Sequence, residues 1–491
     1  MIRIGRRGVL GGGLGAAAGL YFGTGVAIGE WDRYPFTLGV ASGAPTPTRV
    51  TLWTRLAPSP LEIDGGLAPR ALPVQWQIAE DERFCKVVQQ GTAVAFPEAA
   101  HSVHVDVAGL APGRWYFYRF HCGRATSRIG RTRTLPAEDA RVSTLRMAVA
   151  SCQRFEDGYY TAYRDMAVRD LDLVVHVGDY IYENVYTTGA RPRLAEIPSH
   201  LRADATDLQS YRLRHALYRL DPHLQDAHAS APWLVIPNSD EAAEDGEQTP
   251  SDRRSAAYQA FYEHLPMSAV AHPNGPSMRI HHNIDFGALA RLHLLDTQQF
   301  RDDQQVHDPA RSMLGASQEQ WLRRSLSSTD TAWNPIVQAG LFTPYDLAAG
   351  AGRDVYYASW NGYPAARQRL LDDLAETRAR NPVFLSADWH TAWVNNVPAD
   401  RNLDGLPVLT EFLTTGISSS AASTSHLTKP SLPENPQVRF YDENSGYTLC
   451  TINASQWRTD FLAADTSDPG GAVRTVSSWM IESGRPQADQ R

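Results

Sequence analysis

The chain has 491 residues, of which 43% are hydrophobic and 20% are charged. A chain of this length predicts two or three domains with large apolar cores. Its 46 basic residues against 54 acidic ones leave a net charge of −8, which excludes a basic surface field for a nucleic-acid backbone. The mean hydropathy of −0.36 argues against an integral membrane protein with a stable membrane span.

The first segment of the chain has the features of an export signal. Arg6-Arg7 precede a weakly apolar stretch, Gly8 to Gly29, that is rich in Gly and Ala. This stretch is too weakly apolar for a comfortable membrane span and resembles a twin-arginine signal. We therefore expect residues 1–29 to be read by the twin-arginine export machinery, which gives a periplasmic or secreted protein. The alternative is an uncleaved apolar anchor.

Residues 34–136 alternate short strand-like runs with Gly and Pro turns. This spacing predicts an N-terminal β-sandwich domain of immunoglobulin or fibronectin type. A Cys85–Cys122 disulfide inside it is one hypothesis, because an oxidising compartment favours pairing. The expected strands include Val50–Trp53, Val74–Ile78, His101–Val107 and Trp115–Phe120.

From residue 142 onward, strands alternate with helices. Apolar residues at helical spacing predict helices over Tyr159–Arg169, Asp204–Leu220 and Gln368–Arg380. We expect a second domain over residues 142–491, with a mixed α/β core of two sheets. The remaining local expectations are loops over residues 238–254 and 418–431, and a final helix near Trp479 to Glu482.

Three of the expected strands end in residues that can bind a metal. One is followed by Asp179 and Tyr182, another by Cys152, and a third by Asp388 and His390. A lone Asp after a strand is commonly a cap of the next turn, but three such ends in one chain favour a metal site. Thiolate, carboxylate, phenolate and imidazole together suit iron or another transition metal, and spare carboxylates suit calcium.

A series of short motifs runs along the chain in a characteristic order. The motifs are Phe36–Gly43, Val50–Leu56, Gly109–Phe120, Gly130–Thr134, Ala150–Gln153, Gly178–Glu183, Leu295–Arg301, Trp360–Pro364, Asp388–His390 and Phe440–Tyr447. With these motifs the chain resembles the alkaline phosphatase D (PhoD-type) family of metallophosphoesterases. The resemblance covers nearly the whole chain after the N-terminal segment.

The resemblance implies a secreted phosphomonoesterase or phosphodiesterase that acts on a phosphate-ester substrate with ferric iron and calcium. It implies that Cys152, Asp179, Tyr182 and His390 hold the iron. It also implies that Asp179 bridges to calcium and that Asp388 is a second-metal ligand. In the implied mechanism, a metal-bound hydroxide attacks phosphorus in line while the metals neutralise charge on the phosphoryl oxygens.

The chain departs from the family pattern beside these ligands. The family usually has Trp-Asp-Asp-His-Glu where this chain has Pro237-Asn238-Ser239-Asp240-Glu241, and Trp-Asp-Gly-Tyr where it has Trp360-Asn361-Gly362-Tyr363. Each lost carboxylate removes a negative charge from a cation site and predicts weak or altered second-metal binding. We expect Asn238 and Asp240 to be catalytic and Asn361 to be a metal ligand. The alternative is a catalytically weakened relative that binds phosphate esters without efficient turnover.

Several histidines lie outside these motifs. His215 and His228 are expected to be solvated, although an approach to phosphate is an alternative. The pair His281-His282 is expected at the surface or at a strand edge. His101 and His104 are expected to be structural, because they lie far in sequence from the candidate ligands.

Overall fold

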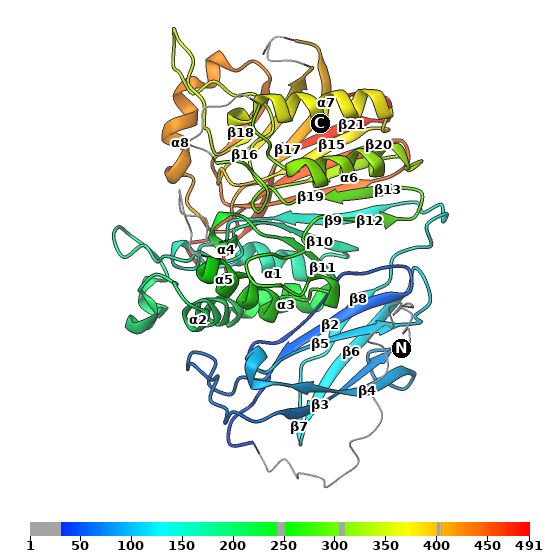
Figure 1. Cartoon of the computed structure of the whole chain (residues 1–491), viewed down its shortest axis with the longest axis vertical. Helices are drawn as coiled ribbons and strands as arrows, with labels where there is room; N and C mark the ends of the chain where they lie inside the picture. The colour runs from blue at the N-terminus through cyan, green and yellow to red at the C-terminus, as the bar shows by residue number, and fades with distance from the viewer. Residues whose placement is uncertain (1–30, 243–250, 304–309, 400–402, 404) are drawn as a thin grey trace, which may run out of the picture.

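A computed structural model describes residues 31–242, 251–303, 310–399, 403 and 405–491 of the chain (Figure 1). Within these residues, no helix combines the length and the apolar character needed to cross a membrane. The expected signal over residues 1–29 lies outside the described residues.

The N-terminal region is built from two layers of β-strands that enclose a core of their own. Leu52, Val74, Tyr118 and Phe120 belong to this core, and burial alternates along the strands with a period of two. The expected strands are confirmed, while the immunoglobulin or fibronectin type stays a prediction. One layer holds β1 (Val40–Gly43), β2 (Arg49–Arg55) and β5 (Ser102–Ala108); the other holds β3 (Leu72–Ala79), β4 (Val87–Ala95), β6 (Trp115–Cys122), β7 (Ala125–Thr126) and β8 (Gly130–Arg133).

The first of these layers is also one end of a ten-stranded sheet that continues into the rest of the chain. β1 pairs in parallel with β11 through Gly43 and Trp233. Gly43 is needed there because a Cβ would lie 2.3 Å from the carbonyl oxygen of Pro266. The division into domains over residues 34–136 and 142–491 stays a prediction, since one sheet spans both. The other strands of this sheet are β9 (Leu145–Ala150), β10 (Leu173–Val177), β11 (Trp233–Ile236), β19 (Gly446–Ile452), β20 (Gln456–Ala464), β21 (Val473–Glu482) and β22 (Asp489–Gln490).

A seven-stranded sheet packs face to face against the ten-stranded one. Val383 and Leu385 of β15 lie in the core between the two sheets, whereas Phe384 lies in a separate core under two helices. This alternation places both faces of β15 in apolar surroundings and confirms the expected two-sheet α/β arrangement. The strand order is β12 (His282–Phe286), β13 (Ala290–Leu294), β14 (Asn334–Val337), β15 (Pro382–Ser386), β17 (Pro407–Leu413), β16 (Ala392–Pro398) and β18 (Val438–Asp442).

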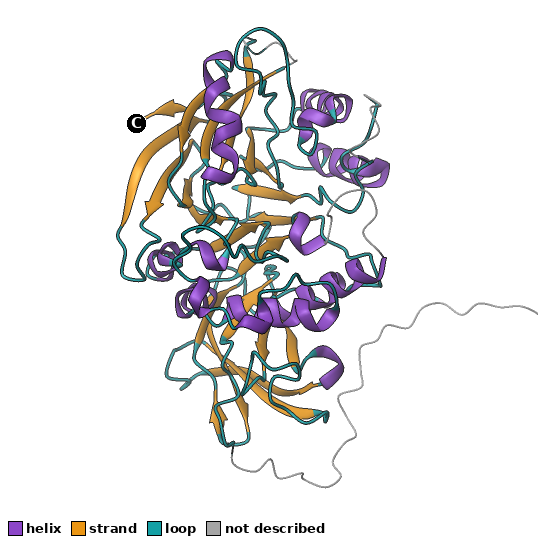
Figure 2. Ribbon diagram, turned by 90° about the vertical axis from the view of Figure 1, so that its left-hand side faces the viewer, coloured by secondary structure: helices purple, strands orange, loops and turns teal. Residues whose placement is uncertain are grey.

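Helices cover the outer faces of both sheets, and Figure 2 shows them packed against the strands. Leu322 and Leu370 anchor α6 and α7 to the seven-stranded sheet, and Tyr163 and Leu224 anchor α1 and α3 to the ten-stranded one. The helices are α1 (Thr161–Ala167), α2 (Leu208–Arg219), α3 (Pro222–Ser230), α4 (Ser239–Ala242), α5 (Ser251–His264), α6 (Gly315–Ser327), α7 (Pro364–Thr377) and α8 (Ala422–Thr428). Short 3₁₀ segments cover Pro97–Ala99, Phe155–Asp157, Leu194–Glu196, Ser199–Leu201, Ala269–Ala271, Trp360–Gly362 and Lys429–Glu434.

Three local expectations are wrong. The expected final helix is the end of strand β21, in which Ser477, Trp479 and Ile481 are buried in alternation, a period of two rather than of a helix. The expected loop over residues 418–431 contains α8, where the Thr424 hydroxyl donates to the carbonyl oxygen of Trp389. Residues 238–254 hold α4 and the start of α5, while residues 243–250 lie outside the described residues. Tertiary contacts here override weak local propensities.

The hypothesis of a Cys85–Cys122 disulfide is also wrong. Both cysteines are free thiols. Cys122 is buried at the end of β6, where its thiol donates to the carbonyl oxygen of Pro73 at 3.4 Å. Cys85 lies on the exposed connection between β3 and β4. The two side chains therefore occupy the inside and the outside of the same sandwich.

Candidate metal centre

Four of the expected ligands follow β-strands at their carboxyl ends. Cys152 follows β9, Asp179 follows β10, and Asp388 and His390 follow β15. β9 and β10 are parallel neighbours in the ten-stranded sheet, and β15 belongs to the sheet packed against it. Because neighbouring parallel strands present their carboxyl ends at one edge, the topology brings these residues to the same place.

The backbone is left-handed at each of these four positions. The angle φ is 55° at Cys152, 54° at Asp179, 86° at Asp388 and 52° at His390. A residue with a Cβ adopts such angles uncommonly, at a cost on the order of 1–3 kcal/mol. Strain at four candidate ligands is typical of a functional site, since the surrounding packing must hold each turn in place.

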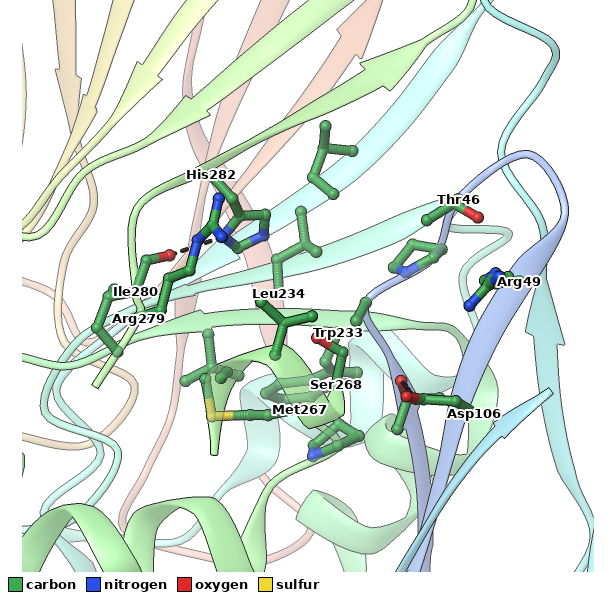
Figure 3. Close-up of a pocket in the computed structure, with 18 of the residues that line it drawn as sticks. Thr46, Arg49, Asp106, Trp233, Leu234, Met267, Ser268, Arg279, Ile280 and His282 are labelled. Atoms are coloured by element: carbon green, nitrogen blue, oxygen red, sulfur yellow. Dashed lines mark hydrogen bonds between the residues drawn. The ribbon is translucent and has the colours of Figure 1, made fainter. Parts of the chain in front are cut away.

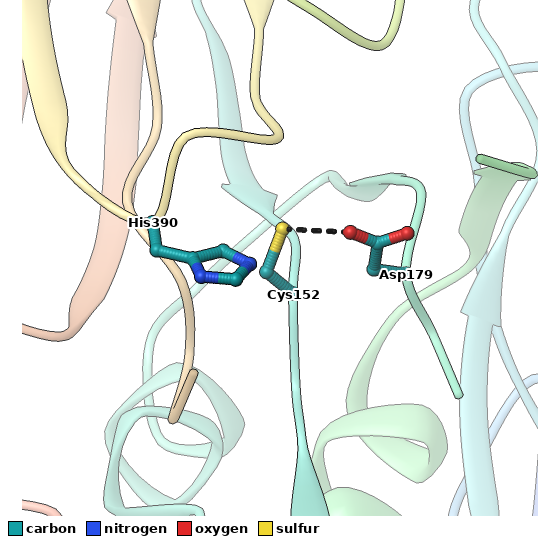
Figure 4. A group of neighbouring side chains, drawn as sticks. All are labelled: Cys152, Asp179 and His390. Atoms are coloured by element: carbon teal, nitrogen blue, oxygen red, sulfur yellow. Dashed lines mark hydrogen bonds between the residues drawn. The ribbon is translucent and has the colours of Figure 1, made fainter. Parts of the chain in front are cut away.

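Three of these side chains form a compact group (Figure 4). One potential ligand atom from each of Cys152, Asp179 and His390 lies within 4.8 Å of the others. The Cys152 thiol donates to Asp179 Oδ2 at 3.3 Å. The hydroxyl oxygen of Tyr182 lies 3.3 Å from Asp179 Oδ2 and 2.9 Å from His390 Nε2. The structure thus brings together all four residues expected around iron.

A distant segment and one arginine hold this group in orientation. Ser419 donates to the Tyr182 hydroxyl at 2.9 Å, and Ser423 Oγ lies 2.7 Å from His390 Nδ1. The bond at Nδ1 leaves the Nε2 atom of His390 facing Tyr182. The guanidinium of Arg154 stacks on the Tyr182 ring, 3.6 Å from its centroid. Such partners fix the orientation of metal ligands.

Asp179 is the most strongly perturbed carboxylate of the group. Burial raises its pKa well above the ordinary range, and the carboxylates of Asp240, Glu241 and Asp388 raise it further. Its Oδ1 atom is buried and has no hydrogen-bond partner among the described residues. A bound cation satisfies that oxygen and favours the ionised carboxylate. The electrostatics of Asp179 therefore fit a metal ion.

The other three members of the group also fit a cation. Burial raises the pKa of the Cys152 thiol and of the Tyr182 hydroxyl, and the charge of Asp179 raises both further. Burial lowers the pKa of His390 to about 4, so its imidazole is neutral at pH 7. Neutral imidazole is the form that binds metals, and a nearby cation favours thiolate and phenolate.

Asp388 and Asn238 form a second side of the site. Asn238 Nδ2 donates to Asp388 Oδ1 at 2.7 Å, and Gln298 Nε2 donates to Asn238 Oδ1 at 2.5 Å. Burial raises the pKa of Asp388, while the bond from Asn238 lowers it. Two neutral amides, Asn238 and Gln298, are thus hydrogen-bonded in series to Asp388 on this side.

The two acids after Asn238 bind backbone groups beside Asp179. Glu241 accepts from the N–H groups of Asp179 and Ile181 at 3.1 and 2.9 Å, and from Asn238 N–H at 2.9 Å. Asp240 Oδ1 accepts from Glu183 N–H at 3.0 Å. Both acids therefore hold the turn that carries the ligands. Sequence reasoning missed this role of Glu241, although its place in the altered motif was a signal.

The side chain of Asn361 bonds to backbone groups away from the other expected ligands. Its Oδ1 atom accepts from Tyr345 N–H at 2.9 Å, and its Nδ2 atom donates to the carbonyl oxygen of Thr343 at 3.2 Å. Asn361 is also absent from the lining of the pocket beside Asp388. The structure does not bring this residue together with the other expected ligands.

A pocket of about 160 Å³ adjoins the second side. Besides Asn238 and Asp388, its lining includes Gln298, Arg301 and Tyr356. The charge of Asp388 and burial raise the pKa of Tyr356 to about 12, so its hydroxyl is a hydrogen-bond donor at pH 7. Arg301 and Tyr356 were not predicted as site residues, although Arg301 ends one of the family motifs.

The expectation that His215 and His228 are solvated is wrong. Both rings are completely buried. His228 stacks on Trp233 with ring centroids 3.7 Å apart, and its Nε2 atom lies 2.8 Å from the hydroxyl of Tyr180. His282 begins the edge strand β12, as expected.

Residues 147–461 match the family model of PhoD-like phosphatases, and residues 24–136 match the model of the N-terminal domain of PhoD-like phosphatases. The chain belongs to the PhoD-like phosphatase family. It is 40% identical to alkaline phosphatase D of Bacillus subtilis (strain 168), over 96% of this chain and 86% of that protein. It is also similar to a solved structure of PhoD, with a TM-score of 0.87, 39% identity and coverage of 94% of this chain and 93% of that one. The expected family and its class of enzyme, a phosphoesterase, are confirmed.

Proposed function

We propose that this protein is a secreted, metal-dependent phosphoesterase that hydrolyses phosphomonoesters, phosphodiesters or both. The observation that carries the proposal is the convergence of Cys152, Asp179, Tyr182 and His390 at strand ends, in a chain of the PhoD-like phosphatase family. Family membership supports the reaction, and the unpartnered Asp179 Oδ1 supports a cation at this place.

Each side of the site receives its own ion in this proposal. The four residues Cys152, Asp179, Tyr182 and His390 would hold ferric iron, because thiolate, phenolate and imidazole suit a transition metal. Asp179 and Asp388 would hold calcium between them, with the Asn238 oxygen available after its side chain rotates. Asn361 is left out of this set, because its oxygen accepts from Tyr345 N–H. When bound, such ions supply Lewis-acid stabilisation and a water that ionises near neutral pH.

The remaining residues of the site position the substrate. Arg301 lines the pocket beside Asp388, where a guanidinium can bind phosphoryl oxygens in a bidentate manner. The Tyr356 hydroxyl, protonated at pH 7, can donate to an ester or phosphoryl oxygen. Asn238 faces the same pocket, whereas Asp240 acts through the backbone of Glu183 and is a positioning residue.

The test is hydrolysis of p-nitrophenyl phosphate and of its bis-ester by folded, exported protein with iron and calcium added. Asp179→Ala is the inactive reference, and Asp372→Ala, on an exposed face of α7, is the matched control. We expect release of nitrophenol by the natural chain and the control, and none above background by Asp179→Ala. Equal rates in all three proteins would exclude the proposal.

A second function is favoured by the hydrogen bond from Asn238 to Asp388, which occupies an oxygen that a metal would use. In that case the chain binds phosphate esters with little turnover. A variant that combines Asn238→Asp, Ser239→Asp, Asp240→His and Asn361→Asp restores the family pattern and discriminates between the two functions. A rise in kcat by orders of magnitude would support the weakened relative. A fall would support a site that is tuned to its present residues.

Export through the twin-arginine route is a further part of the proposal and rests on Arg6-Arg7 and the stretch that follows. Replacing both arginines by lysine is expected to retain the protein in the cytoplasm. Cell fractionation checks this, and unchanged export of the Lys-Lys variant would contradict it.

A further inference from the structure

A cavity of about 430 Å³ lies where the N-terminal region meets the two sheets of the rest of the chain (Figure 3). Its lining comes from the segment after β1, from β2 and from β5 on one side, and from β11, the segment after α5 and β12 on the other. The volume is that of small-molecule sites, which span roughly 300–1,000 Å³. None of its lining residues lines the pocket beside Asp388, so the cavity is separate from the candidate metal centre.

The floor and walls of the cavity are largely apolar. Trp233 and Leu234 of β11 form part of the lining, together with Met267, Ile280 and Ile284. Figure 3 shows Leu234 in the middle of the group of labelled residues, with Met267 below it. An apolar ligand body that removes this surface from water gains about 25 cal/mol per Å².

The lining of the cavity carries more positive than negative charge. Arg279 is exposed and makes no hydrogen bond or ion pair with a described residue. Asp106 already accepts from the Thr51 hydroxyl at 2.5 Å and from Ala269 N–H at 3.4 Å, and it lies on the strand beside that of Arg49. Two arginines against one aspartate leave an excess positive charge on this lining, although the whole chain carries a net charge of −8.

Arg279 is the charged group best placed to bind a ligand. Figure 3 shows Arg279 and His282 at one side of the cavity, and Arg49 and Asp106 at the other. The carboxylate of Asp106 therefore offsets Arg49 rather than Arg279. His282 Nδ1 is bonded to the carbonyl oxygen of Ile280 at 2.7 Å, which fixes the ring beside Arg279.

We propose that this cavity binds a small amphipathic anion, with an apolar aromatic or aliphatic body on β11 and one carboxylate or sulfonate group at Arg279. The site is distinct from the proposed phosphoesterase centre and does not depend on it. A ligand here contacts β11 and the segment that follows β1, beside the β1–β11 pair that joins the N-terminal strands to the rest of the sheet. Because it binds only the folded chain, it also raises the melting temperature.

The test uses two fluorescent probes with the same ring systems, titrated into the full chain. Anilinonaphthalene sulfonate carries a sulfonate, and N-phenylnaphthylamine lacks it. We expect saturable binding of one sulfonate probe per chain. Arg279→Gln should weaken the sulfonate probe roughly tenfold and leave the neutral probe unchanged, because only the former makes a charge-assisted contact.

Two further variants complete the experiment. Val270→Trp should abolish binding of both probes, because Val270 lines the cavity and the larger ring occupies its space. Its side chain is 66% exposed, so the substitution does not disturb a core. Arg474→Gln, at an exposed position of β21, is the charge control and should bind both probes as the natural chain does.

The proposal is overturned if binding does not saturate at one probe per chain, or if Val270→Trp binds as the natural chain does. It is also overturned if Arg279→Gln and Arg474→Gln weaken the sulfonate probe equally, because the effect would then come from net charge alone. Hydrolysis of p-nitrophenyl phosphate by the same variants stays unchanged whichever result is obtained, which separates this site from the phosphoesterase centre.

Discussion

The two sides of the candidate metal centre differ in how their polar atoms are satisfied. On the first side, Cys152, Tyr182 and His390 surround Asp179 and bond to it or to one another. One oxygen of Asp179 is buried without a partner among the described residues. This arrangement is electrostatically incomplete, because buried polar atoms are normally paired.

On the second side, hydrogen bonds join Asp388 to two neutral amides, and Gln298 Oε1, an amide oxygen, is left buried without a partner among the described residues. Asp388 accepts from Asn238, and Asn238 accepts from Gln298. An amide in the place of a carboxylate lowers the negative charge and satisfies Asp388 without a cation. A cation on the first side would therefore complete the structure, whereas a cation on the second side would have to displace existing hydrogen bonds.

The largest expected effect comes from Asp179, which in the proposed function serves both sides. Asp179→Asn keeps the shape and removes the charge, so we expect iron and calcium to be lost together and hydrolysis to fall at least about a thousandfold. Metal analysis and steady-state kinetics measure this, with Asp372→Asn as the control. If Asp179→Asn loses only one metal, Asp179 does not join the two sides.

Tyr182→Phe is expected to affect the first side alone. The iron-loaded natural chain should show a visible absorption band from the phenolate, and the variant should lose this band and roughly a hundredfold in activity. Tyr186→Phe is the matched control. The Tyr186 ring also stacks on Arg154, but Tyr186 is not a candidate metal ligand. A band that survives in Tyr182→Phe would exclude Tyr182 as a ligand.

Asn238→Asp tests the second side. An added carboxylate should lower the calcium concentration for half-maximal activity about tenfold, since calcium affinity depends on ligand charge. With chelator present, the same variant should melt at a lower temperature, because the new carboxylate repels Asp388. Asn238→Ala removes the amide without adding charge and should not lower the calcium requirement by about tenfold. A higher calcium requirement in Asn238→Asp would show that the Asn238 amide does not weaken calcium binding on the second side.

Gln298→Ala should have a smaller effect on the same side. The variant removes the hydrogen bond that Gln298 donates to Asn238, which contributes about 1 kcal/mol to holding the amide in its present orientation. The calcium concentration for half-maximal activity should therefore change about fivefold. In the Asn238→Asp background the effect should disappear, because the rotating amide is gone. A double-mutant cycle of calcium activation measures the coupling. Additive effects would show that Gln298 acts independently of Asn238.

The last effect, on the stability of the fold and not on the metal centre, is expected from acid. Burial lowers the pKa of His293 in β13 to about 4. The unfolded chain therefore binds a proton between about pH 6.5 and 4 that the folded chain does not, and stability falls as the pH falls through this window. We expect His293 to contribute about 2 kcal/mol to the loss of stability at pH 5 relative to pH 7.5. Urea unfolding of His293→Gln should show a weaker pH dependence than the natural chain, and an equal dependence would exclude His293 as the cause.

Much of the first side could be predicted from the sequence. Each of Cys152, Asp179 and His390 stands directly after an apolar run, and both the strand and the turn are encoded by near neighbours. The residues that orient these ligands could not be found this way. Ser419 and Ser423 lie in a Ser/Thr-rich segment whose composition predicts a loop, and their role depends on contacts with Tyr182 and His390 from far along the chain.

Asn361 illustrates the opposite error. Its motif matches a family position, yet the side chain bonds to Tyr345 and Thr343. A motif places a residue in the chain order but does not set the direction of its side chain. The two buried histidines, His215 and His228, show the same limit, since a polar residue type predicts exposure unless the surrounding helices are known.

The sequence alone indicated the strands of the N-terminal region, the turns that carry the candidate ligands and the class of chemistry that those ligands support. These depend on local periodicity and on residue type. Only the tertiary structure decided that Asn238 bonds to Asp388, that β1 joins β11 through Gly43, and that a cavity opens at this junction. Such features depend on side-chain directions and on packing between distant segments, which no local pattern encodes.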